Sequence, residues 1–264
     1  GSITTNLTTM NFLKIGKGNA KLTKDTATFS LLAGHSCPGA SKCEAFVTVD
    51  ENGKAKINTG KDAEFRCFSA NAEARFPNTY KAHKYNFDLV KHIPEPEKIA
   101  ELIHASIVAK NMIGKIKFFR VHVDGDFFMY RYFKAWMIVA AKMPEVRFYS
   151  YTKSLNHLIR GMNEGIIPDN YVFTASRGGK FDHLIDEHGL RSARVVMNEA
   201  EAESLGLPID HDDSNARGKG GDFALLIHGG QPKGTQAAIV WDKMMKKGVG
   251  GYRKGKERNL ALAA

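Results

Sequence analysis

The sequence predicts an α/β fold, a TIM-like (β/α) barrel that need not be complete or regular, in one domain over residues 11–264. Three observations lead to this class. Short apolar segments alternate with segments of helical periodicity, a pattern typical of parallel βαβ units. The 264 residues are 43% hydrophobic and 25% charged, which is ordinary for a globular protein. No repeat or linker divides the chain, so a closed barrel of about seven strands is the simplest arrangement.

Each predicted element has its own signal. Asp50-Glu51-Asn52-Gly53 lies between two short apolar segments and predicts a β-hairpin. Ile99, Ile103 and Ile107 fall on one face of a helix, and Pro144 ends a later helix. Strands are predicted at 26–32, 46–49, 55–57, 117–123, 146–151, 171–174, 193–197 and 223–227. Helices are predicted at 78–91, after Pro96, from Phe133 to Met143 and from Ser154 onward.

The charge balance favours a polyanionic partner. The chain has 38 Lys and Arg against 28 Asp and Glu, a formal charge of +10. Seven of the basic residues lie between 243 and 258, which predicts an irregular basic tail that contacts nucleic acid. No run of about eighteen apolar residues suggests a membrane span. Residues 1–10 resemble a tag remnant without a secretory pattern, so the cytoplasm is the expected location.

The three cysteines form the sharpest motif. Cys37, Cys43 and Cys67 follow the spacing C-x5-C-x23-C, and His35 lies just before the first of them. A predicted metal-binding loop therefore spans residues 35–67. Three Cys and one His suit a tetrahedral zinc site. Three thiolates alone suit a [4Fe–4S] cluster with one open iron. Buried apolar cysteines are the alternative without a metal.

Carboxylates at the ends of predicted strands are candidate catalytic groups. Asp124-Gly125-Asp126 follows the strand 117–123, where a barrel carries its chemistry. A carboxylate there can act as a nucleophile or as a general acid or base, although Asp126 could also cap the next helix. Asp210, Asp212 and Asp213 form a second acidic cluster, which is otherwise an ordinary solvated loop.

Aromatic, basic and glycine-containing segments near other strand ends are candidate substrate contacts. Aromatic rings can stack on bases, Lys and Arg can pair with phosphates, and freed backbone amides can bind a base edge or a phosphate. The predicted substrate-binding residues are His122, Phe127, Tyr149, Tyr151, Lys153, Arg177, Gly178, Gly179, His228, Gly229, Gly230 and Gln231.

Several segments together resemble a known phage family. The segments 29–40, 65–68, 120–128, 149–154, 209–214 and 226–234 resemble the phage gene product eighty-eight family, over nearly the whole chain from residue 11. The resemblance implies a phage protein acting in the cytoplasm of an infected host. In the family pattern a serine often stands at the position of Asp124, which favours Asp126 as the essential carboxylate.

Two enzyme classes resemble parts of the same pattern. Asp124-Gly125-Asp126-Phe127 and the Cys and His set resemble the tRNA-guanine and 7-deazaguanine DNA transglycosylases, which are barrels with zinc and two catalytic aspartates. The position of Cys37 after the first strand resembles radical-SAM barrels, which use an iron–sulfur cluster with S-adenosylmethionine. The usual C-x3-C-x2-C spacing of that class is absent here. A non-catalytic DNA-binding phage protein with a structural metal is the third interpretation.

The leading expectation from sequence is a transglycosylase that exchanges guanine for a 7-deazaguanine base, in DNA in preference to tRNA. Asp126 would attack C1′ of the nucleotide, and Asp124 or the acidic cluster would manage the protons. The target base would have to leave the stack of the duplex.

Overall fold

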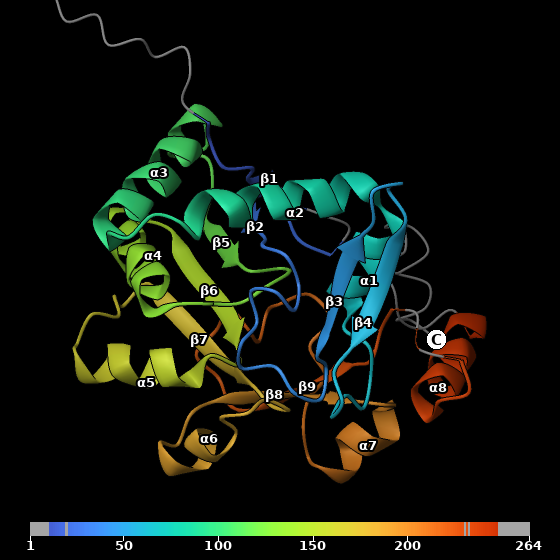
Figure 1. Cartoon of the computed structure of the whole chain (residues 1–264). Helices are drawn as coiled ribbons and strands as arrows, with labels where there is room; N and C mark the ends of the chain where they lie inside the picture. Colours follow the sequence, from blue (N-terminus) through green and yellow to red (C-terminus); the bar gives the residue numbers. More distant parts are fainter. Residues whose placement is uncertain (1–10, 19–20, 230, 232, 248–264) are drawn as a thin grey trace, which may run out of the picture.

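The computed structural model describes residues 11–18, 21–229, 231 and 233–247. Its centre is a seven-stranded sheet in the order β1-β2-β5-β6-β7-β8-β9 (Figure 1). β1 pairs with β2 in antiparallel orientation, and every other pairing is parallel. The predicted alternation of strands and helices is confirmed. The sheet strands are β1 (Gly16–Lys17), β2 (Thr26–Phe29), β5 (Phe118–Val121), β6 (Arg147–Thr152), β7 (Tyr171–Ser176), β8 (Ser192–Val196) and β9 (Phe223–Leu226).

The sheet is open over the described part of the chain. β1 and β9 are its edges, and no pairing between described residues joins them. A TIM barrel closes with eight parallel strands, whereas six strands run parallel here and antiparallel β1 occupies the edge beside β2. The predicted α/β class and parallel sheet are therefore present, but a closed barrel is not.

Helices cover one face of the sheet and form the main core. Pro96 begins α3, and Ile99, Ile103 and Ile107 all lie on its buried face, as their spacing predicts. Trp136 of α4 packs against Phe119 of β5 with ring centroids 5.3 Å apart. The helices in this core are α2 (Pro77–Val90), α3 (Pro96–Ala109), α4 (Tyr130–Lys142), α5 (Leu155–Asn163) and α6 (His183–Glu187).

The other face of the sheet carries a smaller core. On β6, Phe148 joins the main core, whereas Tyr149 belongs to a cluster with Val172 and Phe223. The alternation follows from the two-residue period of a strand. Ala216 in the segment between β8 and β9 also joins this cluster, so that segment lies over the second face.

A separate hairpin packs beside the sheet. β3 (Ala45–Val49) and β4 (Ala55–Thr59) pair in antiparallel orientation, as predicted, and α1 (Phe68–Arg75) packs against them (Figure 1). The sequence did not predict α1, α6, α7 (Glu199–Ser204) or α8 (Gln236–Lys246). Because α8 includes residues 243–246, the first part of the predicted irregular tail is helical. Residues 1–10 and 248–258 of the predicted terminal segments lie outside the described residues.

Candidate functional site

The cysteine loop lies where β2, β6 and β7 end. A backbone hydrogen bond joins the amide of Lys180 to the carbonyl of Gly39, at 2.8 Å. A Cβ on Gly39 would lie 2.4 Å from the carbonyl oxygen of Lys153, so the loop backbone and the end of β6 are in close contact. Since parallel strands all end at one edge of a sheet, the loop lies at the edge where such folds place their chemistry.

The three cysteines reach this edge from two segments. Cys37 and Cys43 lie in the loop after β2, and Cys67 is the N-cap residue of α1. All three are free thiols and half-buried. Burial raises the pKa of Cys37 and of Cys67, and the charges of the neighbouring cysteines raise both further. The thiols therefore share one electrostatic environment. Within the described residues, no three His, Cys, Asp or Glu side chains form a ready-made metal-binding group.

His35 belongs to the hairpin side of the loop. Its Nε2 lies 3.0 Å from the carbonyl oxygen of Val47, and its ring packs edge-on against Phe46. The residue is otherwise exposed. Nε2 of His35 is therefore in contact with a backbone carbonyl, and a zinc ion could bind this ring only through Nδ1.

Lys153 brings a positive charge to the thiols. Its Nζ donates a hydrogen bond of 2.7 Å to Ser176 Oγ at the end of β7. Burial lowers the pKa of Lys153, but the nearby charges of Cys43 and Asp126 outweigh it and leave that pKa raised. A cation near the thiols is suited to balance the negative charge that thiolates carry when they bind a metal.

Asp126 is buried and fully hydrogen-bonded. Its Oδ1 accepts from Thr152 Oγ1 at 2.7 Å and from the amide of Phe127 at 2.8 Å, and its Oδ2 accepts from the amide of Lys153 at 2.8 Å. Burial raises the pKa of this carboxyl, against those hydrogen bonds. The side chain ties the turn after β5 to the end of β6, and thereby positions Lys153.

Asp124 takes part in a buried polar chain. Ser69 donates a short hydrogen bond to Asp124 Oδ1, and His83 Nε2 lies 3.4 Å from Oδ2. His83 Nδ1 lies 2.7 Å from Glu73 Oε2, and Glu73 accepts from the amide of Ala33. Burial lowers the pKa of His83, but the two carboxylates beside it outweigh this and raise it.

The second acidic cluster divides into two different environments. Asp213 is buried, with Lys21 Nζ at 2.8 Å, Arg120 at 3.0 Å and Tyr149 Oη at 2.9 Å. Burial opposes its ionisation, yet those cations lower its pKa to about 2. Two further carboxylates of the cluster, on Asp210 and Asp212, accept backbone hydrogen bonds within their own loop. The cluster thus closes the loop over the second face of the sheet.

Comparison with known proteins gives one match. The family model Gene product 88 matches residues 10–243, which is most of the chain. The chain belongs to the Gene product 88 family. That is the phage family which the sequence motifs resemble. No curated protein and no solved structure matches the chain. A search of the described residues for a helix long and apolar enough to span a membrane finds none.

Several predicted substrate residues of this Gene product 88 chain have structural contacts. His122 and Phe127 are buried in the aromatic core, and His122 Nε2 lies 2.7 Å from Tyr132 Oη. The amides of Gly178 and Gly179 both donate to the carboxylate of Asp182.

The predicted segment after β9 lies against α1. Gln231 binds the backbone of Arg66, accepting from its amide at 2.7 Å and donating to its carbonyl. The ring of His228 packs on Phe68 with centroids 4.5 Å apart, and burial lowers the pKa of His228 to about 4. A Cβ on Gly229 would lie 3.2 Å from Phe68, so little room separates this segment from α1. Gly230 lies outside the described residues.

Sequence reasoning missed several polar residues of the Gene product 88 site. Ser69 and Glu73 lie on α1, which was not predicted, and His83 lies on α2 within the helix predicted at 78–91. Lys21 and Arg120 pair with Asp213 from distant parts of the chain. The only local sequence feature that could have indicated these residues is the four-residue spacing of Ser69 and Glu73, which puts both on one face of a helix.

Proposed function

We propose that this protein is an iron–sulfur enzyme of the radical-SAM type that acts on nucleic acid. The observation that carries the proposal is the placement of the three cysteines: Cys37 and Cys43 lie in the loop after the first of six parallel strands, and Cys67 is the N-cap of α1, near enough to Lys153 for all three to raise its pKa. Three thiolates can hold a [4Fe–4S] cluster and leave one iron open. The open sheet is consistent with a partial barrel of that type.

The environment of Asp126 favours this class over the transglycosylase. A zinc site of three Cys and one His would use His35 through Nδ1, since Nε2 already lies 3.0 Å from the carbonyl oxygen of Val47, a contact that is compatible with either metal. A glycosyl-enzyme needs a carboxylate oxygen that a sugar carbon can reach, whereas Asp126 is buried and its oxygens tie the turn after β5 to the end of β6. Base exchange through Asp126 is therefore the less favoured function.

The thiols would have to come together to accept a metal. They already act on one another electrostatically, but they do not form a closed group in the described residues. Metal binding would replace protons on the thiols and couple loop closure to binding, as in other metal sites. When bound, a cluster with an open iron supplies electrons to S-adenosylmethionine for radical chemistry.

The residues around the thiols have distinct parts in this proposal. Lys153 would stabilise negative charge beside the cluster, and Asp126 would hold Lys153 in place. Tyr151 is half-buried on the second face with the Arg120 guanidinium 5.3 Å from its ring centroid, an arrangement that suits stacking on a base. The formal charge of +10 favours a nucleic-acid substrate, and we propose DNA in preference to tRNA as that substrate.

Anaerobic purification tests the proposal directly. We expect brown protein with about four irons and four sulfides per chain after reconstitution, and an absorbance band that dithionite bleaches. Changing any one of Cys37, Cys43 or Cys67 to Ser should remove most of the iron and the band.

The matched control is His35→Gln. Three-thiolate ligation predicts that this variant keeps its full iron content and spectrum. Colourless protein with about one zinc per chain, which His35→Gln releases, would refute the iron–sulfur proposal and support the transglycosylase site. Protein that binds neither metal, with stability unchanged by chelator, would refute both.

A further inference from the structure

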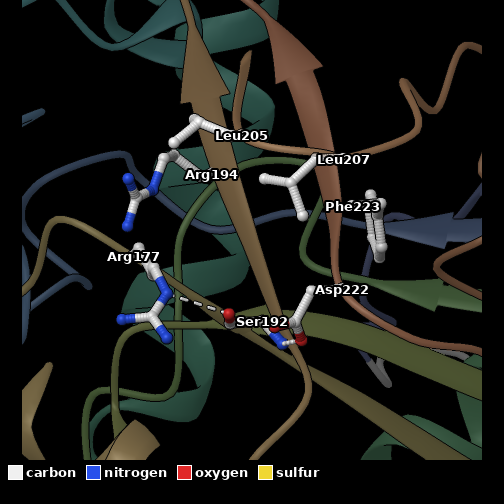
Figure 2. Close-up of a pocket in the computed structure, with 7 residues that line it drawn as sticks. All are labelled: Arg177, Ser192, Arg194, Leu205, Leu207, Asp222 and Phe223. Atoms are coloured by element: carbon white, nitrogen blue, oxygen red, sulfur yellow. Dashed lines mark hydrogen bonds between the residues drawn. The ribbon is translucent and has the colours of Figure 1, made fainter. Parts of the chain in front are cut away.

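A pocket lies on the sheet outside the cysteine site, between the end of β7 and the starts of β8 and β9. It is lined by Arg177, Ser192, Arg194, Leu205, Leu207, Asp222 and Phe223 (Figure 2). β8 begins beside the last residues of β7, since Ala175 pairs with Ser192. The remaining residues of β8 therefore have no β7 residue beside them. Figure 2 shows the side chains of Arg177 and Arg194 projecting to the same side of the pocket.

The two guanidinium groups leave donors available to a ligand. Arg177 donates through Nε to Ser192 Oγ at 2.9 Å and through Nη2 to Asp186 at 3.0 Å. A guanidinium has five N–H donors, so three of those on Arg177 remain. The side chain of Arg194 is exposed and has no hydrogen-bond or ion-pair partner within the described residues.

The remaining charges near the pocket do not cancel these cations. Asp186 is 79% exposed, so its ion pair with Arg177 is a weak surface pair. Asp222 accepts a hydrogen bond from the amide of Ser192 and also acts on Arg191, whose own pKa burial lowers. One carboxylate thus faces the pocket against two arginines.

The size of the pocket restricts the ligand. Its volume is about 180 Å³. That is several times the share of roughly 30 Å³ that one water takes in the liquid, but below the roughly 300–1,000 Å³ of pockets for drug-sized ligands. Leu205, Leu207 and Phe223 provide an apolar wall beside the arginines. A phosphate group with part of a sugar fits this size and chemistry, because arginine binds phosphate through paired N–H donors.

The pocket is connected to the cysteine loop through a short basic segment. Arg177 is followed by Gly178 and Gly179, and the backbone of Lys180 bonds to Gly39 in the cysteine loop. The side chain of Lys180 is exposed. Cations therefore continue from the pocket toward the thiols, an arrangement that suits a chain of phosphates better than a single carboxylate.

We infer that Arg177 and Arg194 bind a backbone phosphate of the nucleic-acid strand and hold that strand alongside the cysteine loop. The inference rests on the nucleic-acid part of the proposed function and is independent of the iron–sulfur cluster. The same phosphate chemistry is offered by a free mononucleotide, so the test distinguishes the two sources.

The experiment measures oligonucleotide affinity against salt concentration for the full chain and for Arg194→Gln. Loss of one phosphate contact should reduce the slope of log affinity against log salt by about 1, with weaker binding for every sequence tested. The control Arg75→Gln removes the same charge from the exposed end of α1 and should leave the slope unchanged. Arg177→Gln should repeat the effect of Arg194→Gln.

Each alternative outcome has a distinct meaning. Equal effects of Arg194→Gln and Arg75→Gln would overturn the inference, because the pocket would then add only general charge. If the oligonucleotide binds but Arg194→Gln changes nothing, the inference fails while the nucleic-acid proposal stands. If only a mononucleotide binds, and Arg194→Gln abolishes that binding, a strand at this pocket is ruled out. The absorbance spectrum of the cluster should be unchanged in all these variants, so failure of the cluster proposal would be seen separately.

Discussion

At the scale of single residues, burial decides which polar side chains are available for chemistry. Asp126 ends a strand beside a glycine, which predicts a reactive carboxylate from sequence. In the fold, its oxygens accept from Thr152 and from the amides of Phe127 and Lys153. An unpaired buried carboxylate would be costly, so these hydrogen bonds are what allow Asp126 to lie in the interior. The same environment makes it a positioning group for Lys153.

We expect His122 to contribute to the pH dependence of the free energy of unfolding. Burial lowers its pKa from 6.5 to about 3, so the folded protein excludes a proton that the unfolded chain binds below about pH 6.5. As the pH falls below about 6.5, protonation of His122 in the unfolded chain stabilises that state. The contribution of His122 to the free energy of unfolding is therefore highest near neutral pH and decreases toward acidic pH. From these two pKa values, the loss between pH 7 and pH 5 is about 2 kcal/mol.

The variant His122→Asn should remove this contribution. Asn tolerates the positive φ of 69° at this position, and it does not titrate. We expect the free energy of unfolding, from urea titrations, to fall less between pH 7 and pH 5 in the variant than in the parent chain. His92→Asn, at an exposed position, is the control and should keep the parent pH dependence. Identical pH dependence for His122→Asn and the parent would show that His122 titrates normally in the folded state.

At the scale of elements, local sequence patterns correctly predicted the helices and strands whose formation depends on neighbouring residues. The hairpin, α3 and the parallel strands follow from turn residues and hydrophobic periodicity, and all are present. α1 was missed because its mean composition is polar and its buried residues include Ser69 and Glu73. The long-range pairing of Asp213 with Lys21 and Arg120 has no local signal, since only the fold brings those segments together.

Close packing of the cysteine loop against β6 can be tested at Gly39. Gly39→Ala would place a Cβ 2.4 Å from the carbonyl oxygen of Lys153, which is backbone and cannot rotate away. We expect a loss of about 1–3 kcal/mol in the free energy of unfolding, typical of overpacking, and faster reaction of Cys37 and Cys43 with a thiol reagent. Chemical denaturation and thiol titration measure the two effects.

The matched control for Gly39 is Gly221→Ala. A Cβ on Gly221 would meet no atom within 4 Å, so this variant should be close to neutral in both assays. Equal stability and equal thiol reactivity in Gly39→Ala and the parent would mean that the loop does not pack on β6 as described.

At the scale of the whole molecule, net charge and its placement govern association with a polyanion. The described basic residues of α8, Lys243 and Lys246, end a helix whose other face is anchored by Ala237 and Met244. Basic residues also line the Arg177 and Arg194 pocket, far from α8 in sequence. If both regions contact one strand, the salt dependence of binding should reflect several phosphates rather than one.

Truncation after Lys247 tests the contribution of the last residues while keeping α8 intact. It removes Arg253, Lys254, Lys256 and Arg258 together with Glu257, and so lowers the formal charge by three from +10. Each lost phosphate contact should reduce the slope of log affinity against log salt by about 0.9 on duplex DNA. Replacing the four basic residues by Gln at full length should give the same slope as truncation, because both variants lose the same four cations. An unchanged slope in both variants would assign nucleic-acid binding to the described part of the chain. A slope that changes only on truncation would show that residues 248–264 contribute through contacts other than those of the four basic side chains.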